Sequence, residues 1–218
     1  MTNARSKTKA HQKYELADGT RVKGVTTIIG GNLGWNKNVL IAWARREAMA
    51  GNDPNLVRDE AASIGTITHY LIECHLKTRI MDLSIYAKHD IDIAETCFLA
   101  YLEWEKAHDL KTIQADGMPL VSEKYRYGGT LDWVGYIDGK LAIMDYKTGT
   151  GVYDEAKIQA AAYKQLWMEN NSGQGDPMFW LLHLGKVDGE FAPYQWPDLS
   201  RWWSVFEHLL AIDQLRER

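Results

Sequence analysis

Two acidic residues and a lysine stand on neighbouring strand-like segments near the middle of the 218-residue chain. Asp132 belongs to the first segment, and Asp145 and Lys147 stand two residues apart on the second. Because side chains alternate along a strand, Asp145 and Lys147 are expected to point to the same face of a sheet. Charged groups at the end of an apolar strand are costly to desolvate unless they serve a purpose. The most economical purpose is a metal site for phosphodiester hydrolysis.

Hydrolysis of a phosphodiester needs an activated water and neutralisation of the charge on the phosphate and the leaving oxygen. Mg²⁺ or Mn²⁺ supplies most of this and prefers oxygen ligands. Asp132, Asp145 and the backbone carbonyl of Tyr146 offer such ligands. Lys147 does not bind a cation, but its ammonium group is expected to hold the attacking water or the phosphate and to stabilise developing negative charge. The structural alternative is a plain ion pair between Asp145 and Lys147, which contributes only about 0–1 kcal/mol when exposed.

A helical segment follows these strands and places Gln159 and Tyr163 four residues apart on one face. The three runs 129–132 (GTLD), 145–149 (DYKTG) and 159–163 (QAAAY) occur in order along the chain. This set resembles the GxxD, DxKTG and QxxxY motifs of the PD-(D/E)XK nuclease superfamily. The resemblance is nearest to its RecB-like exonuclease branch, which includes phage exonucleases and mitochondrial genome maintenance exonucleases. That branch also has a helical Gly-x-x-x-His segment, which residues 65–69 (GTITH) match.

The resemblance covers roughly residues 60–170 and implies a metal-dependent DNA exonuclease that acts on single strands or DNA ends in replication, recombination or repair. It implies Mg²⁺ or Mn²⁺ as the cofactor and DNA as the partner. The implied roles are metal ligation by His69, Asp132 and Asp145, catalysis by Lys147, contact with nucleic acid by Gln159 and Tyr163, and an accessory acid in Glu123 on the preceding strand. Two alternatives stay open, an endonuclease and a catalytically inactive nucleic-acid-binding module with the same fold.

The sequence departs from the family pattern at three points. Leu131 stands before Asp132 where the superfamily name has a proline, and the second acid is Asp145, where the RecB-like branch commonly has Glu. The chain has only Cys74 and Cys97, so it cannot supply the four cysteines of the iron–sulfur members. We therefore expect a nuclease site without an iron–sulfur cluster.

Further contacts with nucleic acid are predicted in the N-terminal part of the chain. Trp35 follows Gly34 in a predicted loop and is a candidate for base stacking. Arg45 and Arg46 lie on a predicted helix, where they either contact phosphates or only solubilise the helix. Residues 1–50 hold nine Lys or Arg against three Asp or Glu, whereas the rest of the chain holds 16 against 26. A basic N-terminal part joined to an acidic remainder is consistent with a protein that binds a polyanion at one place and cations at another.

Hydrophobic spacing defines the elements that position these residues. It predicts an α+β fold with a restriction-endonuclease-like PD-(D/E)XK core, in which helices flank a central mixed sheet. Residues 1–13 are expected to be a flexible basic tail before a single domain, 14–218. Its part 14–110 is mainly helical, and its part 111–218 holds the sheet core and a C-terminal helix. The predicted helices are 37–50, 53–77 with an interruption at Gly65, 91–108, 153–169 and one from 197 onwards. The predicted strands are 14–29 as a hairpin that Gly30 and Gly31 end, 121–127, 130–137, 141–147, 178–184 and 191–196.

Composition restricts the class of protein further. A hydrophobic content of 45% and a charged content of 25% are ordinary for a globular domain. No segment approaches the roughly 20 apolar residues that a membrane-spanning helix needs, and the N-terminus lacks the apolar stretch of a secretory signal. Two cysteines do not make a disulfide scaffold. These features favour the cytoplasm of a bacterium or of a phage-infected host, without a membrane partner.

Overall fold

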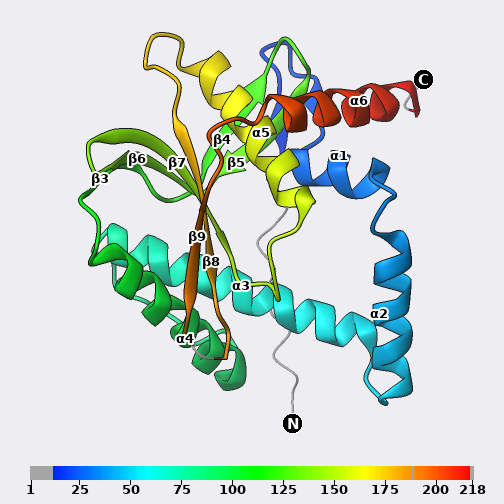
Figure 1. Ribbon diagram of the computed structural model, residues 1–218, viewed down its shortest axis with the longest axis vertical. Helices are drawn as coiled ribbons and strands as arrows, with labels where there is room; N and C mark the ends of the chain where they lie inside the picture. Colours follow the sequence, from blue (N-terminus) through cyan, green and yellow to red (C-terminus); the bar gives the residue numbers. More distant parts are fainter. Residues whose placement is uncertain (1–11, 188, 217–218) are drawn as a thin grey trace.

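The computed structural model describes residues 12–187 and 189–216 and shows an α+β fold around a mixed five-stranded sheet (Figure 1). β7 and β8 are parallel, and the other neighbouring strands are antiparallel. The predicted fold class, with a central mixed sheet flanked by helices, is confirmed. The strands in spatial order are β3 (Leu110–Gln114), β6 (Trp133–Ile137), β7 (Lys140–Lys147), β8 (Met178–Leu184) and β9 (Phe191–Gln195).

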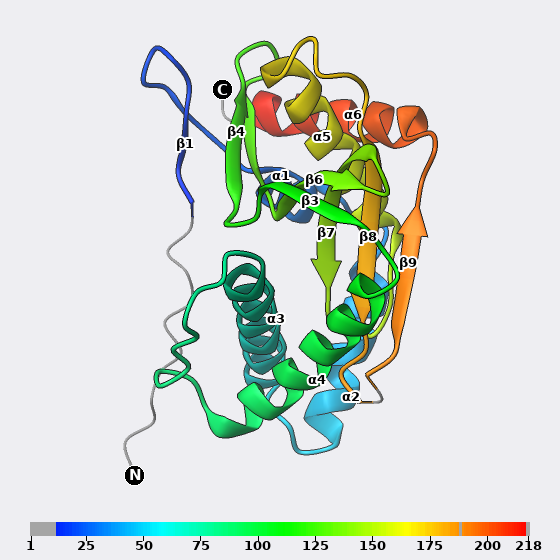
Figure 2. The ribbon, with the colours of Figure 1, turned by 90° about the vertical axis from the view of Figure 1, so that its left-hand side faces the viewer.

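Helices cover both faces of this sheet because its central strands are apolar on both sides. Ile143 of β7 packs into a core shared with three helices, whereas its neighbours Ala142 and Met144 pack into a second core on the opposite face. Figure 2 shows the sheet between these two groups of helices. The first group is α1 (Val25–Asn32), α5 (Asp154–Asn170) and α6 (Ser200–Arg216), the second is α3 (Pro54–Leu76) and α4 (Lys88–Glu105), and α2 (Lys37–Met49) links α1 to α3.

Two short antiparallel pairs complete the fold. β4 (Met118–Ser122) pairs with β5 (Tyr127–Leu131), and β5 leads into β6 through Asp132. The N-terminal hairpin of β1 (Tyr14–Glu15) and β2 (Arg21–Val22) docks on β5, where the Gly128 N–H donates to the Lys23 carbonyl at 2.9 Å. The N-terminus of the described chain therefore lies beside the strand that leads to Asp132.

The predicted strands 121–127 and 130–137 are wrong in their bounds. Residues 123–126 form a turn, with Arg126 at a positive φ of 62° and its N–H bonded to the Ser122 carbonyl. The second predicted strand is broken at Asp132, where the chain bends from β5 into β6. β3 was not predicted, because its residues are mostly exposed and show no apolar alternation.

The predicted breaks at three glycines are also wrong. Gly30 and Gly31 lie inside α1, whose Val25, Ile28 and Ile29 are buried at helical spacing. This burial against α5 and α6 outweighs the strand preference of β-branched residues. Gly65 lies inside an uninterrupted α3, and α4 begins and ends three residues earlier than expected.

The predicted tail falls mostly outside the described residues, which begin at Gln12. Helices α1 to α4 precede residue 110, and the large sheet with α5 and α6 follows it. Within the described part of the chain, no helix combines the length and the apolar character needed to cross a membrane.

Two glycine substitutions test this fold in opposite directions. An alanine methyl at Gly135 of β6 would overlap the Lys111 carbonyl oxygen of β3 and the Trp133 ring, so Gly135→Ala is expected to lower the free energy of unfolding by about 1–3 kcal/mol. The same methyl at Gly30 meets open space within a helix, so Gly30→Ala is expected to raise it by about 0.5–1 kcal/mol. Denaturant unfolding of both variants measures the two changes. A destabilising Gly30→Ala would contradict the continuous α1.

Candidate active site

The last residues of β7 extend beyond its neighbour β6. β6 begins at Trp133 opposite Met144, so residues 145–147 have no β6 partner, while β8 continues beside them to its His183. Asp132 lies at the bend before β6 and fills this open edge. Its Oδ2 accepts a hydrogen bond from the Tyr146 N–H at 3.3 Å. The bend therefore brings Asp132 next to the end of β7, as the sequence predicted for adjacent strands.

Asp145 and Lys147 share one face of β7, as their spacing predicted. The Lys147 Nζ lies 2.7 Å from the Asp145 Oδ2. Asp145 is 4% exposed, whereas the Lys147 side chain is 32% exposed. The Asp145 Oδ2 is buried, and its close partner is the Lys147 ammonium group. A carboxylate oxygen has more than one acceptor position, so Asp145 keeps acceptor capacity inside the site.

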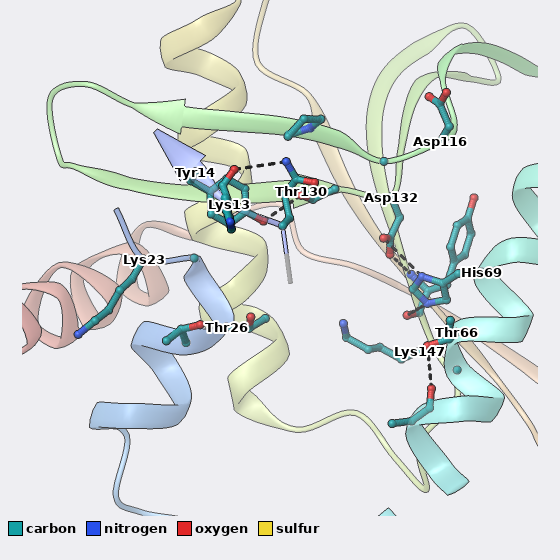
Figure 3. A pocket seen from close by; sticks show the side chains of 18 of the residues that line it. Lys13, Tyr14, Lys23, Thr26, Thr66, His69, Asp116, Thr130, Asp132 and Lys147 are labelled. Atoms are coloured by element: carbon teal, nitrogen blue, oxygen red, sulfur yellow. Dashed lines mark hydrogen bonds and ion pairs between the residues drawn. The ribbon is translucent and has the colours of Figure 1, made fainter. Parts of the chain in front are cut away.

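His69 reaches the same place from α3 (Figure 3). Its Nε2 lies 3.0 Å from the Tyr146 carbonyl oxygen, which only accepts, so Nε2 carries the hydrogen. Its Nδ1 lies 3.4 Å from the Asp132 Oδ1. Gly65, one turn before His69, leaves α3 close to Thr148, whose Oγ1 would be 3.4 Å from an added methyl. The structure thus brings His69, Asp132, Tyr146, Asp145 and Lys147 together.

The mutual charges of this cluster set its protonation. Burial lowers the pKa of His69, but the Asp132 carboxylate outweighs burial and leaves that pKa raised. Burial raises the pKa of Asp132, but His69 and Lys147 outweigh it and leave that pKa lowered. Burial dominates for Asp145 and raises its pKa. For Lys147, burial is outweighed by Asp145 and Asp132, so its pKa is raised and it stays cationic.

A cavity of about 1070 Å³ opens onto the cluster. One side of the cavity carries His69, Asp132 and Lys147, together with the backbone of Tyr146. The opposite side is formed by the N-terminal hairpin and the start of α1, and Figure 3 shows Lys13 and Tyr14 on this side. The space between the two sides gives a ligand access to His69, Asp132 and Lys147, and Asp145 lies buried behind them.

Gln159 and Tyr163 lie on one face of α5, as predicted, and the Gln159 Nε2 donates to the Tyr163 hydroxyl at 2.8 Å. Neither residue is part of the cavity lining. Tyr163 packs on β5, where a methyl on Gly129 would lie 2.7 Å from its Cε1. Burial raises its pKa first, and the nearby Asp145 and Asp132 raise it further. The two residues support the strand behind the site, and their contact with nucleic acid stays a prediction.

Four other predicted residues lie outside the cavity. The strand position predicted for Glu123 is wrong, because Glu123 lies in the β4–β5 turn and accepts a hydrogen bond from the Ala17 N–H at 2.7 Å. Arg45 and Arg46 line a separate shallow groove on α2. Trp35 is 55% exposed in the link between α1 and α2. The contacts of these residues with nucleic acid stay predictions.

Sequence reasoning missed the wall that faces the cluster, which includes Lys13, Tyr14 and Arg21. The signal was present in the tandem glycines Gly128 and Gly129. Glycine inside a strand weakens it and often marks close approach of another group. Here Gly128 receives the ring of Tyr14 on one side of β5, and Gly129 receives Tyr163 on the other.

The cluster offers the donors that a hard divalent cation uses. Within the described part of the chain, no three His, Cys, Asp or Glu side chains are arranged, as they stand, to hold a metal ion. The reason is that the donors contact one another, since His69 binds the Tyr146 carbonyl and Asp145 pairs with Lys147. Two carboxylates, one carbonyl and one imidazole nevertheless match the ligand chemistry of Mg²⁺ or Mn²⁺. The donor set fits such an ion once these contacts are exchanged.

The similarity found to known proteins is one of backbone structure. No protein-family model matches the chain, and no curated protein matches it. A crystal structure from Eubacterium rectale, described as that of a candidate exonuclease, has a TM-score of 0.48 and 14% identity over 72% of this chain. The chain covers 65% of that protein. The structure of SSO0001 has a TM-score of 0.33 and 17% identity, over 71% of this chain and 75% of that one.

The His69–Asp132 pair predicts a pH dependence of stability in metal-free buffer. The pKa of His69 is raised on folding, so protonated His69 stabilises the folded protein. This contribution is fully present below about pH 6.5, the ordinary pKa of histidine, and is lost as pH rises through the raised pKa. His69→Gln is therefore expected to flatten the fall of Tm above about pH 6.5. Thermal unfolding in EDTA measures this. His208→Gln, at an exposed histidine of α6, should keep the wild-type profile, and identical profiles for wild type and His69→Gln would contradict the prediction.

Proposed function

We propose that the chain is a Mg²⁺- or Mn²⁺-dependent deoxyribonuclease of the PD-(D/E)XK type, in its RecB-like exonuclease branch. The observation that carries the proposal is the gathering of Asp132, Asp145 and Lys147 at the end of β7, with His69 beside them. These residues come from three separate motifs that occur in the order of the nuclease family. An isolated structural ion pair would not require His69 and Asp132 at the same place.

The ion would be held by the Asp132 and Asp145 carboxylates, the Tyr146 carbonyl and the His69 imidazole. When bound, it supplies a Lewis acid and lowers the pKa of a coordinated water. The peptide of Tyr146 fixes the donors, because its N–H holds Asp132 and its carbonyl faces His69. The protein thus gathers oxygen and nitrogen donors from the β5–β6 bend, the end of β7 and α3 at one place.

Lys147 is the residue that meets the scissile phosphate or the attacking water. Its ammonium is held cationic by two carboxylates, and its side chain is one-third exposed on the cavity wall. A cation in a partly desolvated site stabilises negative charge more strongly than in water. The role of Lys147 is therefore to orient the phosphate or water and to neutralise charge that develops on oxygen.

The N-terminal helices limit access to this site. Figure 1 shows α2 on the side of the molecule away from β3, where it joins α1 to α3. α2 has no buried residue, and Asn36 at its start donates a hydrogen bond to Glu155 of α5. We propose that this exposed helix, tied to α5 at its start and continuous with the link to α3 at its end, restricts the site to a single strand or a free end. The proposal is therefore an exonuclease rather than an endonuclease.

Removal of the Lys147 ammonium tests the chemistry. Lys147→Ala is expected to reduce cleavage of labelled DNA in Mg²⁺ or Mn²⁺ by about 10²–10³-fold, the loss typical of one charge-stabilising donor. EDTA should abolish cleavage by the wild type. Lys140→Ala, at the exposed first residue of β7, is the matched control and should cleave as wild type does. Wild-type cleavage no greater than that of Lys147→Ala would refute the proposal, and binding without turnover would indicate an inactive nucleic-acid-binding module.

The requirement for an end is tested with circular and linear DNA of the same sequence. An exonuclease is expected to degrade the linear single strand to short products and to leave the closed circle intact. Product sizes on denaturing gels over a time course give the readout, with a metal-free reaction as the control. Cleavage of the circle at a rate similar to that of the linear strand would assign an endonuclease instead.

A further inference from the structure

The cavity wall that faces the metal donors has a different chemistry from the donor side. The hairpin and the start of α1 contribute Lys13, Arg21 and Lys23 to the described lining and no carboxylate. The opposite side contributes Asp116 and Asp132. A polyanion that enters the cavity would therefore meet cations on the hairpin side. This wall belongs to no motif that the proposed nuclease chemistry uses.

Tyr14 is held in this wall by two glycines. A methyl on Gly24 would lie 2.9 Å from the Tyr14 Cε2, and a methyl on Gly128 would overlap the Tyr14 ring. Gly24 and Gly128 also form a bridge between the two backbones. Both glycines lie against the ring, and the hydroxyl reaches Thr130, which also lines the cavity. Glycine in a strand lowers stability, so the two glycines that accommodate the Tyr14 ring are a specific feature of the sequence.

The Tyr14 hydroxyl contacts the strand that leads to Asp132. It shares a hydrogen bond of 2.9 Å with the Thr130 Oγ1. Thr130 stands two residues before Asp132, and both residues line the same cavity as Tyr14. Burial raises the pKa of Tyr14, so the phenol stays protonated. Of two hydroxyls that share one hydrogen bond, one O–H remains to donate to a ligand.

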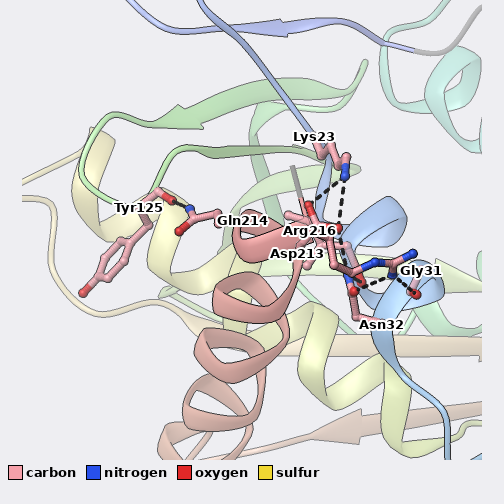
Figure 4. A network of polar contacts seen from close by, with 8 residues as sticks. Lys23, Gly31, Asn32, Tyr125, Asp213, Gln214 and Arg216 are labelled. Carbon is pink, nitrogen blue, oxygen red and sulfur yellow. Dashed lines mark hydrogen bonds and ion pairs between the residues drawn. The ribbon is translucent and has the colours of Figure 1, made fainter. Parts of the chain in front are cut away.

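The wall is anchored from behind by the C-terminal helix (Figure 4). The Lys23 Nζ lies 2.9 Å from the Asp213 Oδ2, and the Asn32 Nδ2 donates to the Asp213 Oδ1 at 2.9 Å. Asp213 is only 7% exposed. Arg216 donates to the Gly31 carbonyl and to the Asn32 Oδ1. These contacts fix the junction between the hairpin and α1, and therefore the position of Tyr14.

We propose that Lys13, Tyr14 and Thr130 form a subsite for a backbone phosphate of the nucleic acid strand, adjacent to the phosphate at the metal donors. The subsite rests on the proposed function for the identity of the strand. Lys13 provides the positive charge, and the hydroxyl pair provides a directed hydrogen bond, a combination suited to a phosphate oxygen. Arg21 lines the cavity as well, but it is paired with Glu15 at 3.3 Å, so the principal cation of the subsite is Lys13.

Binding of a fluorescent single-stranded oligonucleotide in EDTA tests the subsite without cleavage. Tyr14→Phe removes the hydroxyl and keeps the ring between Gly24 and Gly128. It is expected to weaken binding about tenfold, the typical effect of losing a hydrogen bond to a charged group. Lys13→Ala should weaken binding and lower the salt dependence by about 0.7 in the slope of log K against log salt. Tyr136→Phe and Lys140→Ala, on exposed positions outside the cavity, are the matched controls and should bind as wild type.

Single methylphosphonates, each removing the charge of one phosphate, locate the contact. Wild type should lose affinity most at one phosphate, and Lys13→Ala should no longer distinguish that position from the others. Unchanged affinity of Tyr14→Phe and Lys13→Ala, or equal losses in the controls, would overturn the subsite even if the wild type cleaves DNA. If the expected binding pattern appears and metal-dependent cleavage does not, the subsite stands and the proposed nuclease activity fails.

Discussion

The backbone of Tyr146 connects the three parts of the chain on which the site depends. Its N–H binds Asp132 at the β5–β6 bend, and its carbonyl accepts a hydrogen bond from His69 of α3. These contacts are available only because β7 continues three residues past the start of β6. A backbone group without a strand partner needs another one when it is buried. The unequal strand lengths therefore require polar side chains at this edge, and the chain supplies ligand-type residues there.

The tandem glycines of β5 impose a second constraint, since they connect the two sides of the cavity. Gly128 accommodates Tyr14 of the hairpin, and Gly129 accommodates Tyr163 of α5. A side chain at Gly128 would move the hairpin away from β5, and one at Gly129 would move α5 away. Asp132 follows three residues after Gly129, so the same strand positions the acid and both aromatic supports. This explains why a segment with poor strand propensity forms a strand here.

The parts of the site that sequence alone predicts are those set by local periodicity. The alternation of strand side chains placed Asp145 and Lys147 on one face, and helical spacing placed Gln159 beside Tyr163. The resemblance of residues 65–69 to a Gly-x-x-x-His segment grouped His69 with these residues, and the structure brings it beside Asp132. The lining role of Lys13 and Tyr14 was not predictable in this way, because it depends on hairpin docking across more than 100 residues of sequence.

The glycines show the limit of local reasoning most clearly. Gly30 and Gly31 read as a break, but burial of Val25 and Ile28 keeps α1 helical through them. Gly65 read as an interruption of α3, but it lies inside a helix of 23 residues. Glycine lowers helix propensity by about 1 kcal/mol, which packing of several apolar side chains easily exceeds. The same residue type thus signals a turn, a close approach or nothing at all, and only tertiary contacts distinguish these cases.

The charges of the cluster explain why its donors contact one another. Two carboxylates lie beside the imidazole of His69 and the ammonium group of Lys147, and these carboxylates raise the pKa of both groups. The Lys147 ammonium therefore offsets carboxylate charge that a divalent ion would otherwise offset. An imidazole must be neutral to bind a metal, so the raised pKa of His69 opposes ion binding at low pH. Lys147 keeps its charge with or without an ion, because the carboxylates hold it cationic next to the cavity. The two groups therefore differ in role, and that difference follows from the side-chain chemistry of histidine and lysine.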